Sequence, residues 1–101
     1  MTDEQCIPLK HSLGKGFVIP LGSISLVGVV AKNGMVGCGA IDVTALGKFG
    51  YAAARVRPTR GPSVAGIEDL LVAEVKEANE AALRLGIQEG MTGKDALDLL
   101  S

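Results

Sequence analysis

Cys38 is the residue whose type and position could do chemistry. It is flanked by Gly37 and Gly39, and Asp42 follows where a predicted strand gives way to a predicted helix. Because glycines leave space around the sulfur, a substrate could approach it. A thiolate there would be stabilised by the start of the helix and by Arg55 on the next strand. This pattern predicts a catalytic, nucleophilic Cys38.

A structural role for Cys38 is the alternative, and the sequence favours it. Free cysteines are among the most buried residue types, and a strand of small residues has room for one. The only histidine, His11, lies beside a turn far away in the sequence, so no general base accompanies the thiol.

Three arginines, Arg55, Arg57 and Arg60, follow one another within six positions. Guanidinium groups at this spacing favour a site for an anion or a carboxylate. The alternatives are a solvated strand edge and loop, or ion pairs between subunits.

We expect Asp42 to cap a helix rather than to act as an acid. The candidate ligand-binding residues are Gly37, Gly39, Asp42, Arg55 and Arg57.

Metal and cofactor sites are not expected. Cys6 and Cys38 fit neither a metal-ligand spacing nor a disulfide framework, so they favour a reduced, cytoplasmic setting. The Gly37-x-Gly39 motif lacks the third glycine of the dinucleotide-binding fingerprint, because Asp42 occupies that position.

A sheet and three helices must position these residues. Asn33-Gly34 favours a two-residue hairpin with a type I′ turn. Apolar residues spaced by three and four predict a long helix over residues 67–85, and Thr92 with Asp95 resembles a capping box that opens a last helix through residue 100. A short helix over residues 43–48 connects two parallel strands. The predicted strands cover residues 5–10, 17–21, 24–31, 35–40 and 51–57.

These elements predict an α+β fold in one domain over residues 1–101. The expected architecture is two-layer: a mostly antiparallel five-strand sheet with one parallel βαβ crossover, against which one long and two short helices pack. The strand over residues 24–31 is apolar on both faces. We therefore expect it at the centre of the sheet, covered on both sides by helices or by a second subunit.

The composition favours self-association. Hydrophobic residues make up 48% of the 101 positions, which is a surplus for a small domain. The formal net charge is −1, so no basic field favours nucleic acid or an anionic membrane. The acidic N-terminus is unlike a signal peptide, and the apolar run over residues 17–31 is too short to span a bilayer. The partners we expect are further copies of the chain and a small anionic ligand.

Two segments of the sequence carry a resemblance to a known family. Residues 37–43 read Gly-Cys-Gly-Ala-Ile-Asp-Val, and the C-terminal part contains Asp69-Leu70-Leu71, Leu85-Gly86-Ile87 and then Gly-Met-Thr-Gly-Lys-Asp-Ala-Leu over residues 90–97. In order and spacing these segments resemble the YunC-like family of small bacterial and archaeal proteins, a domain of unknown function. The resemblance implies no catalytic residues.

Two functional hypotheses follow. The leading one is a small cytoplasmic protein that associates with itself and has no catalytic activity. The alternative is a small enzyme or anionic-ligand-binding protein that uses Cys38 with Arg55 or Arg57, where the thiolate attacks an electrophile and an arginine holds the negative charge of the substrate. Whether the chain is an enzyme stays open at this point.

Overall fold

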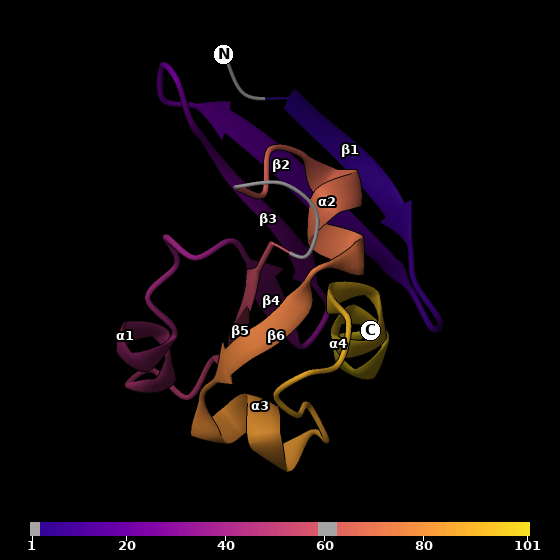
Figure 1. The fold of residues 1–101 in the computed structure, drawn as a ribbon. Coiled ribbons are helices and arrows are strands. Elements are labelled where there is room, and N and C mark those ends of the chain that lie inside the picture. Colours follow the sequence, from indigo (N-terminus) through magenta and orange to yellow (C-terminus); the bar gives the residue numbers. More distant parts are fainter. Residues whose placement is uncertain (1–2, 59–62) are drawn as a thin grey trace.

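The computed structural model describes residues 3–58 and 63–101 and shows one mixed sheet with helices packed against it (Figure 1). The six strands pair in chain order, and all neighbours are antiparallel except β4 and β5, which are parallel. The α+β class and the parallel pair are therefore confirmed, whereas the prediction of five strands and three helices is wrong. The elements are β1 (Asp3–Pro8), β2 (Leu13–Pro20), β3 (Ser25–Ala31), β4 (Gly34–Gly37), α1 (Val43–Gly47), β5 (Ala52–Arg57), α2 (Ile67–Val72), β6 (Glu74–Ala78), α3 (Glu80–Arg84) and α4 (Gly93–Leu100).

The predicted crossover from β4 through α1 to β5 is confirmed. Gly34 lies beside Ala52 in a parallel register that continues to Gly37 beside Arg55, two residues before the end of β5. The short helix begins after Asp42, whose Oδ1 accepts a hydrogen bond from the backbone N–H of Ala45 at 3.0 Å. This bond satisfies one of the free amides at the start of the helix.

The predicted long helix over residues 67–85 is wrong. The helix stops at Val72, because Ala73 adopts an extended conformation (φ −70°, ψ 159°). The next five residues form β6, in which Val75 is buried and Lys76 and Glu77 are exposed. β6 pairs with the edge of β5, whose backbone N–H and C=O groups would otherwise lack partners. Tertiary pairing thus outweighs the helical preference of this alanine- and glutamate-rich segment.

The hairpin between β3 and β4 is confirmed, but its turn was wrongly assigned. Ala31 pairs with Gly34, so the two loop residues are Lys32 and Asn33, and neither has a positive φ. The turn is therefore not type I′. Gly34 belongs to the strand, and it is glycine because a Cβ there would collide with the backbone oxygen of Ala52.

β2 begins at Leu13, four residues earlier than predicted. Gly14 and Gly16 lie on the side of the sheet that packs against α2, where a Cβ on Gly16 would come within 2.9 Å of the Ile67 side chain. The glycines thus let the helix approach the strand, rather than making the strand end.

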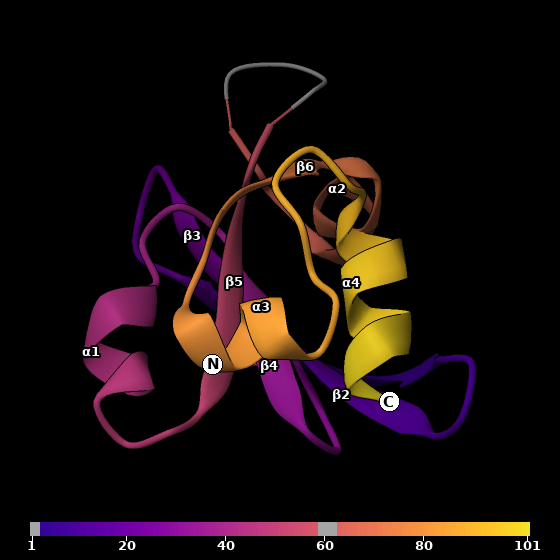
Figure 2. The same cartoon turned by 90° about the horizontal axis from the view of Figure 1, so that it is seen from below.

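Helices lie on both sides of the sheet, so the two-layer prediction needs correction. Figure 2 shows α2 and α4 on one side of β5 and α1 on the other. The main core lies on the side of α2 and α4, with fully buried residues such as Val29, Leu70 and Leu97. A smaller cluster of Met35, Val43 and Ala53 lies under α1. No helix within residues 3–58 and 63–101 has the length and apolar character needed to cross a membrane.

Candidate functional site

A pocket of about 330 Å³ lies where the parallel strands β4 and β5 end. Cys38 and Gly39 line it just after β4, Arg55 and Arg57 line it from β5, and Lys76 lines it from β6. The carboxyl ends of parallel strands are where α/β sheets bind ligands, because the chain leaves the sheet there and opens a crevice. The structure thus brings four of the six candidate residues together.

Cys38 belongs to both the wall of this pocket and the core of the protein. Its backbone N–H donates to the carbonyl oxygen of Val27 at 2.9 Å, which extends the pairing of β4 with β3. Its Sγ lies 3.5 Å from the backbone N–H of Val27 and accepts a hydrogen bond from it. Only 6% of the residue is exposed, and it packs in the same core cluster as Val27 and Val36.

Gly37 and Asp42 do not line the pocket. A Cβ on Gly37 would collide with the Ile41 side chain, so this glycine serves the packing of the loop after β4. Asp42 caps α1, as predicted from the sequence. Gly39 differs from Gly37, because the space beside its Cα is open and it lies on the pocket wall.

Arg55 and Arg57 both form ion pairs with β6. The Nε of Arg55 donates to Oε1 of Glu77 at 2.6 Å, and 27% of the arginine side chain is exposed. Nη2 of Arg57 lies 3.4 Å from Oε2 of Glu74, and 62% of its side chain is exposed. Arg55 is thus held firmly beside the pocket, while Arg57 is more loosely paired. Arg60, the third arginine of the predicted cluster, lies outside the described residues.

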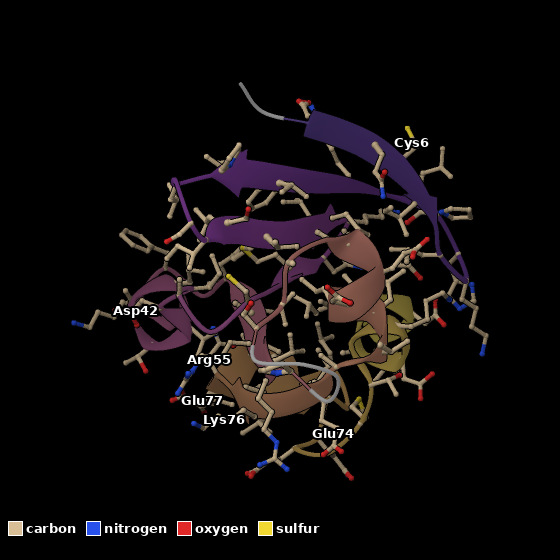
Figure 3. All side chains as sticks on the ribbon, turned by 45° about the horizontal axis from the view of Figure 1, so that its top comes forward. Cys6, Asp42, Arg55, Glu74, Lys76 and Glu77 are labelled. Atoms are coloured by element: carbon tan, nitrogen blue, oxygen red, sulfur yellow. The ribbon has the colours of Figure 1, made fainter. Side chains whose placement is uncertain are left out.

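Lys76 is the cation of this site that sequence reasoning missed. Arg55 pairs with Glu77 and Val56 pairs with Val75, so Lys76 is the extra residue of a β-bulge. Bulges turn side chains out of the regular alternation and are frequent near functional sites. Figure 3 shows Lys76 close to Arg55 and Glu77, far from Cys6 on β1. Sequence reasoning missed it because residues 67–85 read as one helix.

The described residues that line the pocket include three cations and no carboxylate. Two hydroxyl-bearing residues, Ser25 and Ser63, also line it. The only histidine, His11, lies elsewhere, where its backbone N–H donates to Ser101 Oγ. Within residues 3–58 and 63–101, no three His, Cys, Asp or Glu side chains are placed to hold a metal ion. The site can attract negative charge, but none of the described residues lining it is an obvious general base.

Comparison with known proteins places the chain in a family. Residues 37–100, more than half of the chain, match the family described as a domain of unknown function, DUF1805. The chain belongs to this family. The matching segment contains the pocket residues Cys38, Arg55 and Lys76 together with α4.

A solved structure shares the whole fold. The crystal structure of TA1206, a protein of unknown function from Thermoplasma acidophilum, is similar to the entire chain with a TM-score of 0.85 and 26% sequence identity, over 94% of its own length. No curated protein matches the chain. The sequence-based resemblance to a domain of unknown function is thereby confirmed at this coarser level.

Proposed function

We propose that this DUF1805 protein is a cytoplasmic protein that works as a homo-oligomer, in which a second copy covers the exposed face of strands β1, β2 and β3. We also propose that it lies in the YunC-like part of the family, on the strength of the motifs at residues 37–43 and 90–97. The single observation that carries the self-association proposal is an uncovered, largely apolar sheet face.

That face, called the outer face below, is the side of β1–β3 away from α2 and α4. Side chains alternate along a strand, and Gly14 and Gly16 point toward the helices, so their neighbours on β2 point outward. Phe17 is one of them, since its ring lies over Gly28 of β3. By this alternation the outer face carries Glu4, Cys6, Leu13, Lys15, Ile19 and Val30. Phe17 lies on the same side but is half-buried against the smaller cluster under α1, and Leu26 packs against the main core.

Several of these apolar side chains are in contact with solvent. Leu13, the first residue of β2 beside the turn that follows β1, is 66% exposed, and Val30 on β3 is 40% exposed. The two charged residues of the face, Glu4 and Lys15, pair with each other at 3.0 Å, so they give the face no net charge. Contiguous apolar surface of this kind is a mark of protein interfaces.

A second copy is the occupant that fits this face best. A depression of about 610 Å³ is lined by Cys6, Lys15, Val30 and Leu13 itself. In a two-fold symmetric interface the same patch is used by both subunits, so the protruding Leu13 of one copy can enter the depression of the other. Flat sheet faces pack on one another about 10 Å apart through interdigitated side chains, which suits this geometry.

The experiment is light scattering on protein eluting from gel filtration, over a concentration series in the micromolar range. We expect a mass that is a multiple of the single-chain mass. We also expect iodoacetamide to alkylate Cys6 more slowly as the protein concentration rises, because the outer face becomes covered. A strictly monomeric mass at every concentration would overturn the proposal.

The alternative that Cys38 is a nucleophile has less support. The sulfur is nearly covered, it accepts a hydrogen bond from Val27, and no histidine lies among the described residues of the pocket wall. We therefore expect Cys38 to be alkylated by iodoacetamide only after the protein is unfolded in urea. Mass spectrometry of the peptides would show this, and rapid alkylation of Cys38 in the folded protein would revive the enzyme hypothesis.

A further inference from the structure

We propose that the pocket at the ends of β4 and β5 binds the oxyanion group of a small molecule, a phosphate or a carboxylate, and that Lys76 and Arg57 provide the charge that holds it. This goes beyond self-association, because the pocket does not share a described lining residue with the outer face. The two proposals can therefore fail independently.

The polar groups on the pocket wall are almost all hydrogen-bond donors. Arg55, Arg57 and Lys76 are cations without acceptor atoms on their side chains, and Ser25 and Ser63 bear hydroxyl groups that can donate. No carboxylate is among the described residues of the wall. A wall of this composition attracts anions and repels cations.

The charges in the pocket are not equally available. Arg55 is engaged by Glu77 at 2.6 Å, so much of its charge is balanced. Arg57 makes one longer contact, of 3.4 Å, to Glu74. Lys76 makes no ion pair with any other described residue, although it stands next to two partnered cations. The β-bulge therefore places Lys76, which has no ion-pair partner among the described residues, on the wall of this pocket, and Lys76 also lines the neighbouring depression that holds Glu74 and Glu89.

Backbone amides add a second, independent feature. The N–H groups of Cys38 and Ile41 are used within the fold, by the carbonyl oxygens of Val27 and Cys38 respectively. The N–H groups of Gly39 and Ala40, which lie between them on the pocket wall, donate to no other described residue. Successive free amides in a turn form an anion-binding feature in many phosphate sites.

The chemistry of the ligand follows from these donors. A guanidinium group binds the paired oxygens of a carboxylate or phosphate with two parallel hydrogen bonds, and an ammonium group adds a point charge. Since the pocket volume is about 330 Å³, it has room for a small molecule around the anionic group rather than for a bare ion alone. Phosphate and carboxylate ligands share this recognition, and the test separates them.

The test is a titration of the ¹⁵N-labelled protein followed by two-dimensional ¹H–¹⁵N NMR, with inorganic phosphate in one series and acetate in the other. Chloride at matched ionic strength serves as the reference, because it screens charge without offering paired oxygens. We expect saturable shifts of the Gly39 and Ala40 amide signals, with a dissociation constant on the order of millimolar for such isolated groups. Saturation by phosphate alone or by acetate alone names the ligand class.

Two variants make the test specific. Lys76→Gln should weaken the binding about two- to fivefold, because it removes one exposed charge from the site. Lys48→Gln makes the same charge change at the exposed end of α1 and should leave the affinity unchanged. The proposal is overturned if neither anion produces saturable shifts at Gly39 and Ala40, or if the two variants weaken binding equally.

Discussion

Asn79 is a side chain that joins three elements, α1, β5 and α3. Its Oδ1 accepts hydrogen bonds from the N–H of Ala82 at 3.0 Å and of Ala53 at 3.2 Å. Its Nδ2 donates to the carbonyl oxygens of Val43 at 2.9 Å and Tyr51 at 2.8 Å. One amide thus caps α3, secures the start of β5 and holds α1, which no aspartate or serine could do with the same set of donors and acceptors.

We predict that Asn79→Ala lowers the free energy of unfolding by roughly 2–4 kcal/mol, since it removes a helix cap and leaves partly buried backbone groups without partners. Urea denaturation followed by circular dichroism measures the change. Asn79→Asp is the matched variant: it keeps the two acceptor contacts but turns an anionic oxygen toward the carbonyl oxygens of Val43 and Tyr51, so it should also destabilise the protein although the cap of α3 is kept. Equal stability of Asn79→Ala and the wild type would show that this side chain does not hold α1 and α3 to the sheet.

Single residues were predicted well where the reason was local. The helix cap at Asp42 needs only its own turn, so the sequence was sufficient to assign it. The role of Gly37 could not be predicted, because it depends on where the Ile41 side chain packs. Lys76 became a pocket residue only through a bulge between two strands. The cap at Asp42 is thus visible in the sequence, whereas the packing of Gly37 and the place of Lys76 depend on contacts that the sequence does not show.

At the scale of elements, β6 shows that the spacing of apolar residues alone does not distinguish a long helix from a helix followed by a strand. Ile67, Leu71 and Val75 are spaced as on one helix face, yet they lie in two different elements, with Leu71 only partly buried. The signal that was missed is Asn79, a good N-cap residue placed before Glu80, which marks a second helix start inside the predicted helix. The prediction of the last helix is confirmed. Thr92 Oγ1 accepts a hydrogen bond from the backbone N–H of Asp95 at 3.1 Å, as the sequence pattern indicates.

α4 also fastens the turn between β1 and β2. Oδ1 of Asp98 accepts a hydrogen bond from the backbone N–H of Lys10 at 2.9 Å, and both its oxygens lie 2.8 Å from Nζ of Lys94. The hydrogen bond from Lys94 is the main cause that lowers the pKa of Asp98 below its ordinary value, and burial opposes it. Ser12 Oγ donates to the carbonyl oxygen of Ser101 at 3.1 Å and completes the contact.

Because the folded state lowers the pKa of Asp98, this carboxylate stabilises the fold while it is ionised. We predict that its contribution is complete at neutral pH and is lost as the pH falls through the lowered pKa of the folded state. Lys94 is partly exposed, so the effect is modest. Asp98→Asn should destabilise the protein at neutral pH and reduce the acid sensitivity of the free energy of unfolding, measured by urea titrations at a series of pH values.

Glu89→Gln is the control for that series, because Glu89 is exposed and forms no ion pair with the described residues. It should leave the pH dependence close to that of the wild type. An Asp98→Asn variant with the same pH dependence as the wild type would contradict the assignment of this carboxylate as an acid-sensitive contact.

At the scale of the whole molecule, helices cover the two sides of the sheet to different extents. α2 and α4 lie against one side, and on the other side the smaller cluster under α1 reaches from β4 and β5 to Phe17 of β2. The sequence predicted that the strand over residues 24–31 would be covered on both sides, because both of its faces are apolar. Within one chain only the side of Val27 and Val29 is fully buried, while Val30 on the other side is 40% exposed. Part of the apolar surplus in the composition therefore lies on the outer face.

The most direct measurement of the central claim is sedimentation equilibrium of the wild type and of two leucine-to-lysine variants. Leu13→Lys places a charge on the outer face, whereas Leu83→Lys makes the same change on α3, at a leucine that is 54% exposed. We predict that the wild type and Leu83→Lys associate alike, and that Leu13→Lys shifts the population to monomers while it keeps the same circular dichroism spectrum. A wild-type protein that is monomeric at all concentrations, or a Leu13→Lys variant that associates as strongly as the wild type, would contradict the account.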